Sequence, residues 1–447
     1  MNTLQKLVRM PIWLTLPAFA ILLDVFGIPI VLLFLNSLNA PTFSIANYQA
    51  FFGQAANVRV LLQTIEVSVV ATAICFIVGY PTAYLITAAS KSVRTALLVF
   101  VAILYLTSLL VRTYAWIVIL GDGGMVNNML LEFGLISNPL PLIYNRLAVY
   151  VGMVHIMLPV MILPLVSVML GIDKSLMSAT RSMGARPLAA FWRVFFPLSL
   201  PGVRSGSLLV FVLCLGFSIT PAALGGLRDA MLSTFIASQV ETSFNVASVA
   251  ASAFILLAVA AAMLAIFGLD FSSTQGRPAG PARAYWWNWL LSMSTLARYL
   301  NQLATPYRAK RWTAKLYQAA SSGRWSQIIG AVFVVFVIFY LLFPSVLVII
   351  MSFSAGPSLQ FPPSGLSLQW YRSFFGEPSW TGAAWTSIQI GIAVTILSTI
   401  VGTLAAYGLN RTFPRLRSSL TMAILGRSPC RVLSSASRLI SDCSSLD

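Results

Sequence analysis

The sequence has very little charge for its length. Charged residues make up 9% of the 447-residue chain, whereas soluble domains carry about 25%. Hydrophobic residues make up 58%, and the mean hydropathy is +0.86. This shortage of charge excludes an ordinary soluble domain and indicates an integral membrane protein.

Acidic residues are scarcer than basic ones. Eleven Asp and Glu residues stand against 28 Lys and Arg residues, which gives a formal net charge of +17. An excess of this size can attract nucleic acid. The basic residues, however, lie mainly between apolar runs, which is the distribution that orients a protein in a membrane. We therefore expect membrane lipid, and no nucleic acid, around this chain.

Residue types that support catalysis or metal binding are also few. The four cysteines have no metal-ligand spacing and imply no disulfide framework. No Gly-x-x-x-x-Gly-Lys-Ser/Thr loop occurs, so the chain does not bind ATP by that route. The single histidine, His155, lies inside an apolar run, and we interpret it as a polar group within a helix bundle. The sequence predicts no enzyme, no metal site and no cofactor.

Long apolar runs define the expected fold. A helix needs about 20 apolar residues to cross a bilayer. Eight runs meet this length, at residues 11–36, 61–89, 95–120, 147–171, 205–226, 249–270, 326–352 and 383–409. The first run is too long for a signal peptide, so we expect it to be retained. The sequence predicts an all-α membrane protein.

The basic residues also predict an orientation. Lys6 and Arg9 precede the first run, and further clusters occur at 91–94, 174–204 and 271–325. All of these fall on one side if every run crosses the membrane, and that side is cytoplasmic by the positive-inside rule. We expect a multi-pass protein of the cytoplasmic (inner) membrane with a cytoplasmic N-terminus.

The sequence contains an internal repeat. Residues 44–53 (Ser-Ile-Ala-Asn-Tyr-Gln-Ala-Phe-Phe-Gly) recur as residues 367–376 (Ser-Leu-Gln-Trp-Tyr-Arg-Ser-Phe-Phe-Gly). At the same offset, residues 77–84 match 400–407. The chain is therefore interpreted as two copies of one membrane unit. A duplicated unit with its substrate path at the repeat interface is typical of transporters.

The repeat divides the chain into four segments. These are a first unit of about six spans at 1–270, a basic cytoplasmic linker at 271–325, the start of a second unit at 326–425, and a polar tail at 426–447. The linker has an aromatic stretch at 285–303, which suits either a helix at the membrane interface or a simple tether. The Ser- and Arg-rich tail cannot cross a bilayer. We interpret the second unit as truncated or frame-shifted, with a natural polar tail as the alternative.

The basic segment at 173–204 has more local structure than a simple connector requires. Asp173 is a suitable N-cap for a first short helix, and Gly184 suits its left-handed C-terminal residue. Pro187 suits the first turn of a second helix. Pro197 and Pro201 are expected to end that helix, and Gly202 to permit a sharp turn.

This segment resembles the cytoplasmic coupling loop of ABC importer permeases, whose signature runs Glu-Ala-Ala, three residues, Gly, and later a Leu-Pro close. The residues that fit are Ala179, Gly184, Ala185, Phe191, Pro197, Pro201 and Gly202. Ser178 and Thr180 depart from the signature, because the family has Glu and Ala there. The resemblance implies the helical bundle of that family. It also implies a separate cytoplasmic ATPase that binds ATP, and an extracytoplasmic solute-binding protein.

A narrower resemblance concerns the solute. Residues 109–116 (Leu-Leu-Val-Arg-Thr-Tyr-Ala-Trp) resemble the third span of the polyamine importer permeases, and the likeness covers most of residues 10–270. Residues 366–409 resemble the partner permease of the same systems. The implied function is ATP-driven import of polyamines or similar organic cations by alternating access. A ferric-iron or other small-solute importer permease is the alternative. Ferric-iron permeases are also often fused duplicates, so the fusion itself does not favour polyamines.

Two further alternatives come from other classes. An ion-coupled secondary transporter would need no ATPase and would leave residues 173–204 unexplained. A non-functional truncated product would insert in the membrane without supporting uptake. Because the chain holds one coupling loop, the second loop of an importer is expected from a second permease or from self-association.

Charged residues inside the apolar runs are the candidates for a translocation path. Asp24, Glu66 and Arg112 lie within predicted spans, where charge is costly. Glu66 and Arg112 are expected to form an ion pair. Alternatively, Glu66 lines the path, while Tyr114 and Trp116 offer aromatic faces to an ammonium group. These two aromatic residues also suit interfacial anchors.

Overall fold

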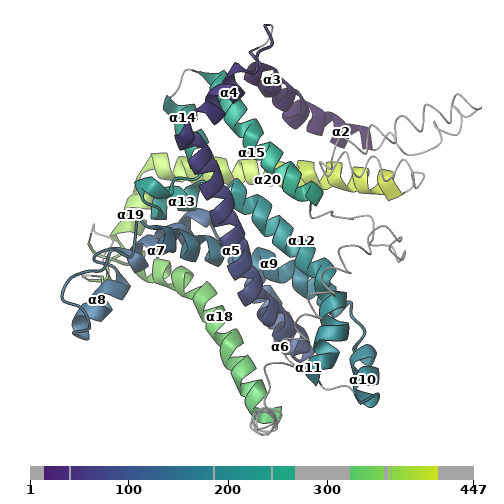
Figure 1. The fold of residues 1–447 in the computed structure, drawn as a ribbon. Coiled ribbons are helices and arrows are strands. Elements are labelled where there is room, and N and C mark those ends of the chain that lie inside the picture. The colour runs from purple at the N-terminus through teal and green to yellow at the C-terminus, as the bar shows by residue number, and fades with distance from the viewer. Residues whose placement is uncertain are drawn as a thin grey trace, which may run out of the picture.

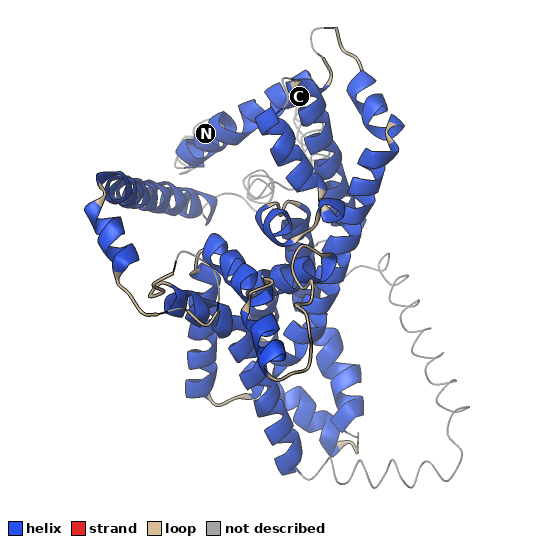
Figure 2. Cartoon of the chain, turned by 90° about the vertical axis from the view of Figure 1, so that its left-hand side faces the viewer, coloured by secondary structure: helices blue, strands red, loops and turns tan. Residues whose placement is uncertain are grey.

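The computed structural model describes residues 15–39, 42–184, 187–242, 245–266, 323–356, 361–363 and 365–410. Within these residues every regular element is helical, apart from one isolated bridge between Ser354 and Leu366 (Figure 2). Eight helices there are long and apolar enough to cross a membrane. The all-α prediction is therefore confirmed, and the number of long apolar helices in the described residues equals the number of expected spans.

The helices follow one another with short connections. Their bounds are α2 (Leu16–Leu22), η2 (Leu23–Gly27), α3 (Ile28–Ser37), α4 (Ala46–Gly53), α5 (Ala55–Ala88), α6 (Lys91–Leu106), α7 (Leu109–Leu120), α8 (Met125–Glu132), α9 (Arg146–Leu170), α10 (Lys174–Ser182), α11 (Pro187–Ala190), η3 (Phe191–Phe195), α12 (Phe196–Leu215), α13 (Ile219–Leu224), η4 (Leu227–Asp229), α14 (Leu232–Thr242), α15 (Val246–Ile266), α18 (Gly323–Met351), α19 (Gln369–Gly376) and α20 (Pro378–Asn410). The segments η2 and η3 are π-helical turns, and η4 is a 3-10 turn.

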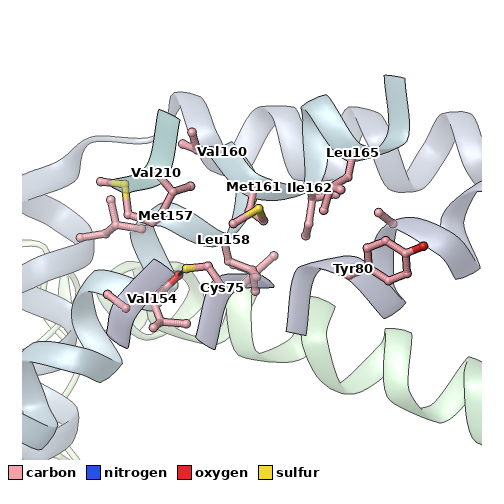
Figure 3. Close-up of a cluster of buried hydrophobic side chains, with 14 of the residues drawn as sticks. Cys75, Tyr80, Val154, Met157, Leu158, Val160, Met161, Ile162, Leu165 and Val210 are labelled. Atoms are coloured by element: carbon pink, nitrogen blue, oxygen red, sulfur yellow. Dashed lines mark hydrogen bonds between the residues drawn. The ribbon is translucent and has the colours of Figure 1, made fainter. Parts of the chain in front are cut away.

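The core of the molecule lies where α5 and α12 pack against α9 (Figure 1). Figure 3 shows part of this core, with Cys75 of α5, Met161 of α9 and Val210 of α12 among its buried side chains. Glycines permit the close approach. A Cβ added at Gly79 would lie 2.9 Å from Cγ of Met161, and one added at Gly206 would lie 3.1 Å from its Sδ. Met161 therefore fills the space that both glycines leave.

Helix α18, from the predicted second unit, packs against α5, α6 and α7 of the first and forms hydrogen bonds with α9. The hydroxyl of Tyr340 donates a hydrogen bond to the carbonyl oxygen of Val151 (2.8 Å). Nε2 of His155 lies 3.1 Å from the carbonyl oxygen of Leu341, to which it donates. The interpretation of His155 as a polar group in the bundle interior is confirmed, since its side chain is buried.

The predicted single span at 95–120 is wrong, because the structure breaks it into α6 and α7. Thr107 and Ser108 between them have extended conformations. The break leaves carbonyl groups at the end of α6 without helical partners. Nη2 of Arg112 donates to the carbonyl oxygens of Thr107 (3.1 Å) and Tyr105 (3.4 Å). A charged side chain thus stabilises a helix break that hydropathy does not reveal.

The span expected at 205–226 is also displaced, because the structure runs it from Phe191 to Leu215. Pro197 lies at the junction of η3 and α12, and Pro201 lies inside α12. The π-helical turn η3 immediately precedes these prolines, and such turns accommodate irregular hydrogen bonding. The expectation that Pro197 and Pro201 end the helix is wrong.

The internal repeat is visible in local structure. Both α4 and α19 are eight-residue helices, and each is followed by a long helix, α5 or α20. The Tyr48 hydroxyl lies 2.8 Å from the Ser37 hydroxyl, and Tyr371 and Ser352 form the same pair at 2.8 Å. The four-segment division itself stays a prediction, since most of the linker and all of the tail lie outside the described residues.

Candidate coupling loop and translocation path

The short helix α10 forms as its sequence predicts. The Asp173 carboxylate accepts a hydrogen bond from the backbone N–H of Ser175 (2.8 Å), which caps the helix. Hydrogen bonds from the Ser175 backbone and side chain lower the pKa of Asp173 below its ordinary value. Gly184 follows the helix with a φ of +85°, a left-handed conformation that suits glycine.

Helix α10 presents an accessible surface. Ser178 and Ala179 are exposed, and Met183 at its end is 81% exposed. Ala185 lies outside the described residues. Helix α11 begins at Pro187, as expected, and leads directly into η3. The signature residues before Gly184 therefore lie on the outside of the molecule.

An aromatic cluster anchors the loop to α5. The ring of Phe191 packs edge-on against those of Tyr84 (5.5 Å between centroids) and Tyr80 (6.2 Å), and Phe195 packs against Tyr84 at 5.1 Å. The hydroxyl of Tyr80 also lies 2.8 Å from that of Ser199 on α12. Sequence reasoning missed both tyrosines, because nothing in the sequence links α5 to a segment more than 100 residues away.

Gly202 has a packing role instead of the predicted turn. It is buried within α12, and a Cβ at this position would lie 3.0 Å from Cβ of Val168 and 3.4 Å from Cα of Leu165. The absence of a side chain lets α12 cross α9 closely. The predicted sharp turn at Gly202 is therefore wrong.

The predicted ion pair between Glu66 and Arg112 does not form. Arg112 binds the carbonyl groups at the helix break. Glu66 instead receives two hydrogen bonds from Nη1 of Arg146, at 3.0 Å and 3.2 Å. Nε of the same Arg146 lies 3.3 Å from Oδ1 of Asp229. One guanidinium group therefore joins α5, α9 and η4.

The two aromatic candidates on α7 separate. Tyr114 is 56% exposed on the outside of the bundle. Trp116 is buried, and its ring lies 5.6 Å from that of His155 and 5.7 Å from that of Tyr340. The structure therefore brings neither aromatic side chain to Glu66. Trp116 instead belongs to the junction between the first unit and α18.

This junction contains buried polar atoms that the described residues leave unsatisfied. They are Nε of Arg112, Nε1 of Trp116 and Nδ1 of His155. Asp24 lies apart from them, exposed on η2. No group of three or more His, Cys, Asp or Glu residues that could hold a metal occurs in the described segments.

The chain is similar in sequence to known transport permeases. No protein-family model matches the chain. The spermidine/putrescine transport system permease protein PotB of Haemophilus influenzae is 34% identical over 202 residues, which cover 45% of this chain and 70% of the relative. The inner membrane ABC transporter permease protein YdcU of Escherichia coli is 30% identical over 199 residues, which cover 41% of this chain and 63% of the relative.

A solved bacterial alginate ABC transporter, in complex with a periplasmic protein bound to alginate pentasaccharide, also shows a likeness. The TM-score is 0.47 at 17% identity, and the match covers 56% of this chain and 90% of the other.

Proposed function

The chain belongs to the ABC transporter permease family that includes the spermidine/putrescine permease PotB, and from this premise we propose that it moves polyamines or related organic cations by ATP-driven alternating access. Its relatives are transport permeases and not enzymes. With eight apolar helices, the chain is a multi-pass protein of the inner membrane. The cytoplasmic orientation of its N-terminus is part of the proposal and rests on the distribution of basic residues.

The observation that carries the proposal is the geometry of the described residues 173–184 and 187–202. A capped helix with exposed signature residues projects from the bundle, and an aromatic cluster joins its base to α5. Such an arrangement suits a docking element that moves together with the transmembrane helices. In the proposed cycle an ATPase subunit binds α10, and closure of the ATPase dimer shifts the helices between two states.

The proposal requires partners. These are a cytoplasmic ATPase, which binds ATP, and an extracytoplasmic solute-binding protein. A second coupling loop would come from another permease or from a second copy of this chain. Within the described residues only 173–202 fits the coupling signature.

Met183→Asp tests the docking surface, because the exposed Met183 side chain can be charged without disturbing the core. The variant should co-purify with less ATPase subunit and should lose most ATP-dependent putrescine uptake in proteoliposomes that also contain the binding protein. Leu135→Asp is the control, since Leu135 is a 70% exposed apolar side chain in the turn after α8 and lies outside the candidate spans. It should behave like the unmodified protein.

Three results would overturn the proposal. Uptake that persists without an ATPase subunit indicates an ion-coupled transporter. Absence of uptake with all partners present indicates a non-functional product. Equal behaviour of the Met183→Asp and Leu135→Asp variants removes α10 as the docking element.

A further inference from the structure

Arg146 is the centre of an ion-pair network at the end of the bundle opposite to the coupling loop. Its Nη1 donates to both carboxylate oxygens of Glu66, at 3.0 Å and 3.2 Å, and its Nε to Asp229 at 3.3 Å. In sequence, the two carboxylates lie 80 and 83 positions from Arg146. The fold therefore brings Glu66 of α5 and Asp229 of η4 to the guanidinium group of Arg146 on α9.

The backbone around η4 holds Asp229 in this position. Gly226 passes so close to the start of α9 that an added Cβ would lie 2.5 Å from the carbonyl oxygen of Tyr144. The amide of Gln63 on α5 donates to the carbonyl oxygen of Arg228 (3.0 Å), and the Thr64 hydroxyl accepts from the Leu232 N–H (2.7 Å). These contacts fix the backbone around η4 against α5, and from that position the Asp229 carboxylate reaches the guanidinium group that also binds Glu66.

Stabilisation of α9 does not account for the arginine. Arg146 is the first residue of this helix, where the helix dipole disfavours a positive charge. Asn145 already caps the helix by accepting a hydrogen bond from the Ala148 N–H (2.9 Å). The arginine side chain therefore binds the two carboxylates and does not stabilise its own helix.

The network also lies at the surface of the helix bundle. The side chains of Arg146 and Glu66 are 38% and 55% exposed, whereas that of Asp229 is 16% exposed. Ion pairs at such exposure contribute little stability, because water and salt compete with them. A cation from the solution can therefore compete with Arg146 for the carboxylates.

We propose that Glu66 and Asp229 form the entry site for an ammonium group of a polyamine, and that Arg146 occupies this site in the state seen here. The inference rests on the proposed function. A primary ammonium carries three N–H donors and can bridge both carboxylates. Its arrival displaces the guanidinium group and frees the start of α9 from α5 and η4. Substrate entry and opening of this end of the path are thereby coupled.

The test is equilibrium binding of radiolabelled putrescine to the full chain in lipid nanodiscs at low ionic strength, without binding protein. Arg146→Gln should bind putrescine more tightly, by up to about fivefold, because the competing cation is gone. Glu66→Gln and Asp229→Asn should each weaken binding, and Glu66→Gln combined with Arg146→Gln should not regain it. 1,4-Butanediol, which has no ammonium group, should not compete.

Two further variants separate this role from a structural one. Arg59→Gln removes an exposed arginine from the same helix as Glu66 and should leave putrescine binding unchanged. Arg146→Lys keeps a cation and should bind putrescine like the unmodified protein. Weaker or unchanged binding by the Arg146→Gln variant overturns the inference, as does an equal gain with Arg59→Gln.

Co-purification of the ATPase subunit, measured in the same preparations, separates the two proposals. If the ATPase co-purifies while putrescine binding does not respond to the variants, the entry site fails and the importer function stands. If no ATPase co-purifies, the importer function itself fails.

Discussion

Helices α5 and α20 begin after the same repeated segment and have nearly the same length, 34 and 33 residues, but their surroundings differ. One face of α5 is buried against α9 and α12. Nearly all described side chains of α20 are exposed, and the helix runs across the molecule from α19 toward α2 (Figure 1).

The local structure of the two helices is the same. The Thr72 hydroxyl bonds the carbonyl oxygen of Ser68, and Thr395, its repeat counterpart, bonds that of Gly391, both at 2.7 Å. Gly79 and Gly402 also correspond. A Cβ at Gly79 would meet Met161, whereas a Cβ at Gly402 would meet nothing within 4 Å. The repeated sequence therefore specifies a helix, and burial depends on which partner helices are present.

The largest expected effect comes from filling the two glycine positions. Gly79→Leu should destabilise the protein by about 1–3 kcal/mol, the range for an overpacked core, because its side chain meets Met161. Gly402→Leu should change stability by less than about 0.5 kcal/mol, since nothing opposes the side chain. Thermal unfolding of the detergent-solubilised variants measures both. Equal destabilisation would show that α20 is packed as tightly as α5.

A smaller effect is expected where the second unit does contact the first. Tyr340→Phe removes the hydrogen bond to Val151 and should cost about 1 kcal/mol. Tyr371→Phe removes the exposed bond to Ser352 and should cost almost nothing. The same unfolding measurement applies. If the two variants are equally stable, the hydrogen bond between α18 and the first unit makes no measurable contribution to the free energy of unfolding.

The smallest effect concerns the cap of α10. The pKa of Asp173 is lower when the helix is folded than when it is unfolded, because the carboxylate accepts hydrogen bonds from Ser175. The cap is therefore complete above the unfolded pKa and is lost as pH falls through the folded pKa. Hydrogen exchange of the α10 amides should accelerate over that acidic range. Asp173→Asn, which keeps a capping side chain without a carboxylate, should remove this pH dependence.

Sequence reasoning captures features that depend on neighbouring residues. Six of the eight apolar runs coincide with long apolar helices, and Asp173, Gly184 and Pro187 predict the ends of α10 and the start of α11. Each of these follows from hydropathy or from backbone preferences within one turn. The helical fold and the local shape of the candidate coupling loop were therefore predictable.

Features that depend on distant partners were not predictable. Glu66 finds Arg146 and Asp229 only because α5, α9 and η4 converge, so the nearer arginine in the sequence, Arg112, was the wrong choice. The break at Thr107 is stable because Arg112 satisfies the exposed carbonyl groups. The helix at Pro201 continues after a π-helical turn. No single-segment pattern contains this information.

The continuity of α5 has a mechanical consequence. Tyr84, in the aromatic cluster at the base of the candidate coupling loop, and Glu66, in the ion-pair network, belong to this one helix. At 1.5 Å of rise per residue they lie about 27 Å apart along its axis. Because α5 stays helical through Pro81, we expect a tilt imposed at the Tyr84 end to move the Glu66 carboxylate relative to Arg146. One continuous helix thus connects the aromatic cluster at Tyr84 to the ion pair between Glu66 and Arg146, so we expect movement at the first site to change the geometry of the second.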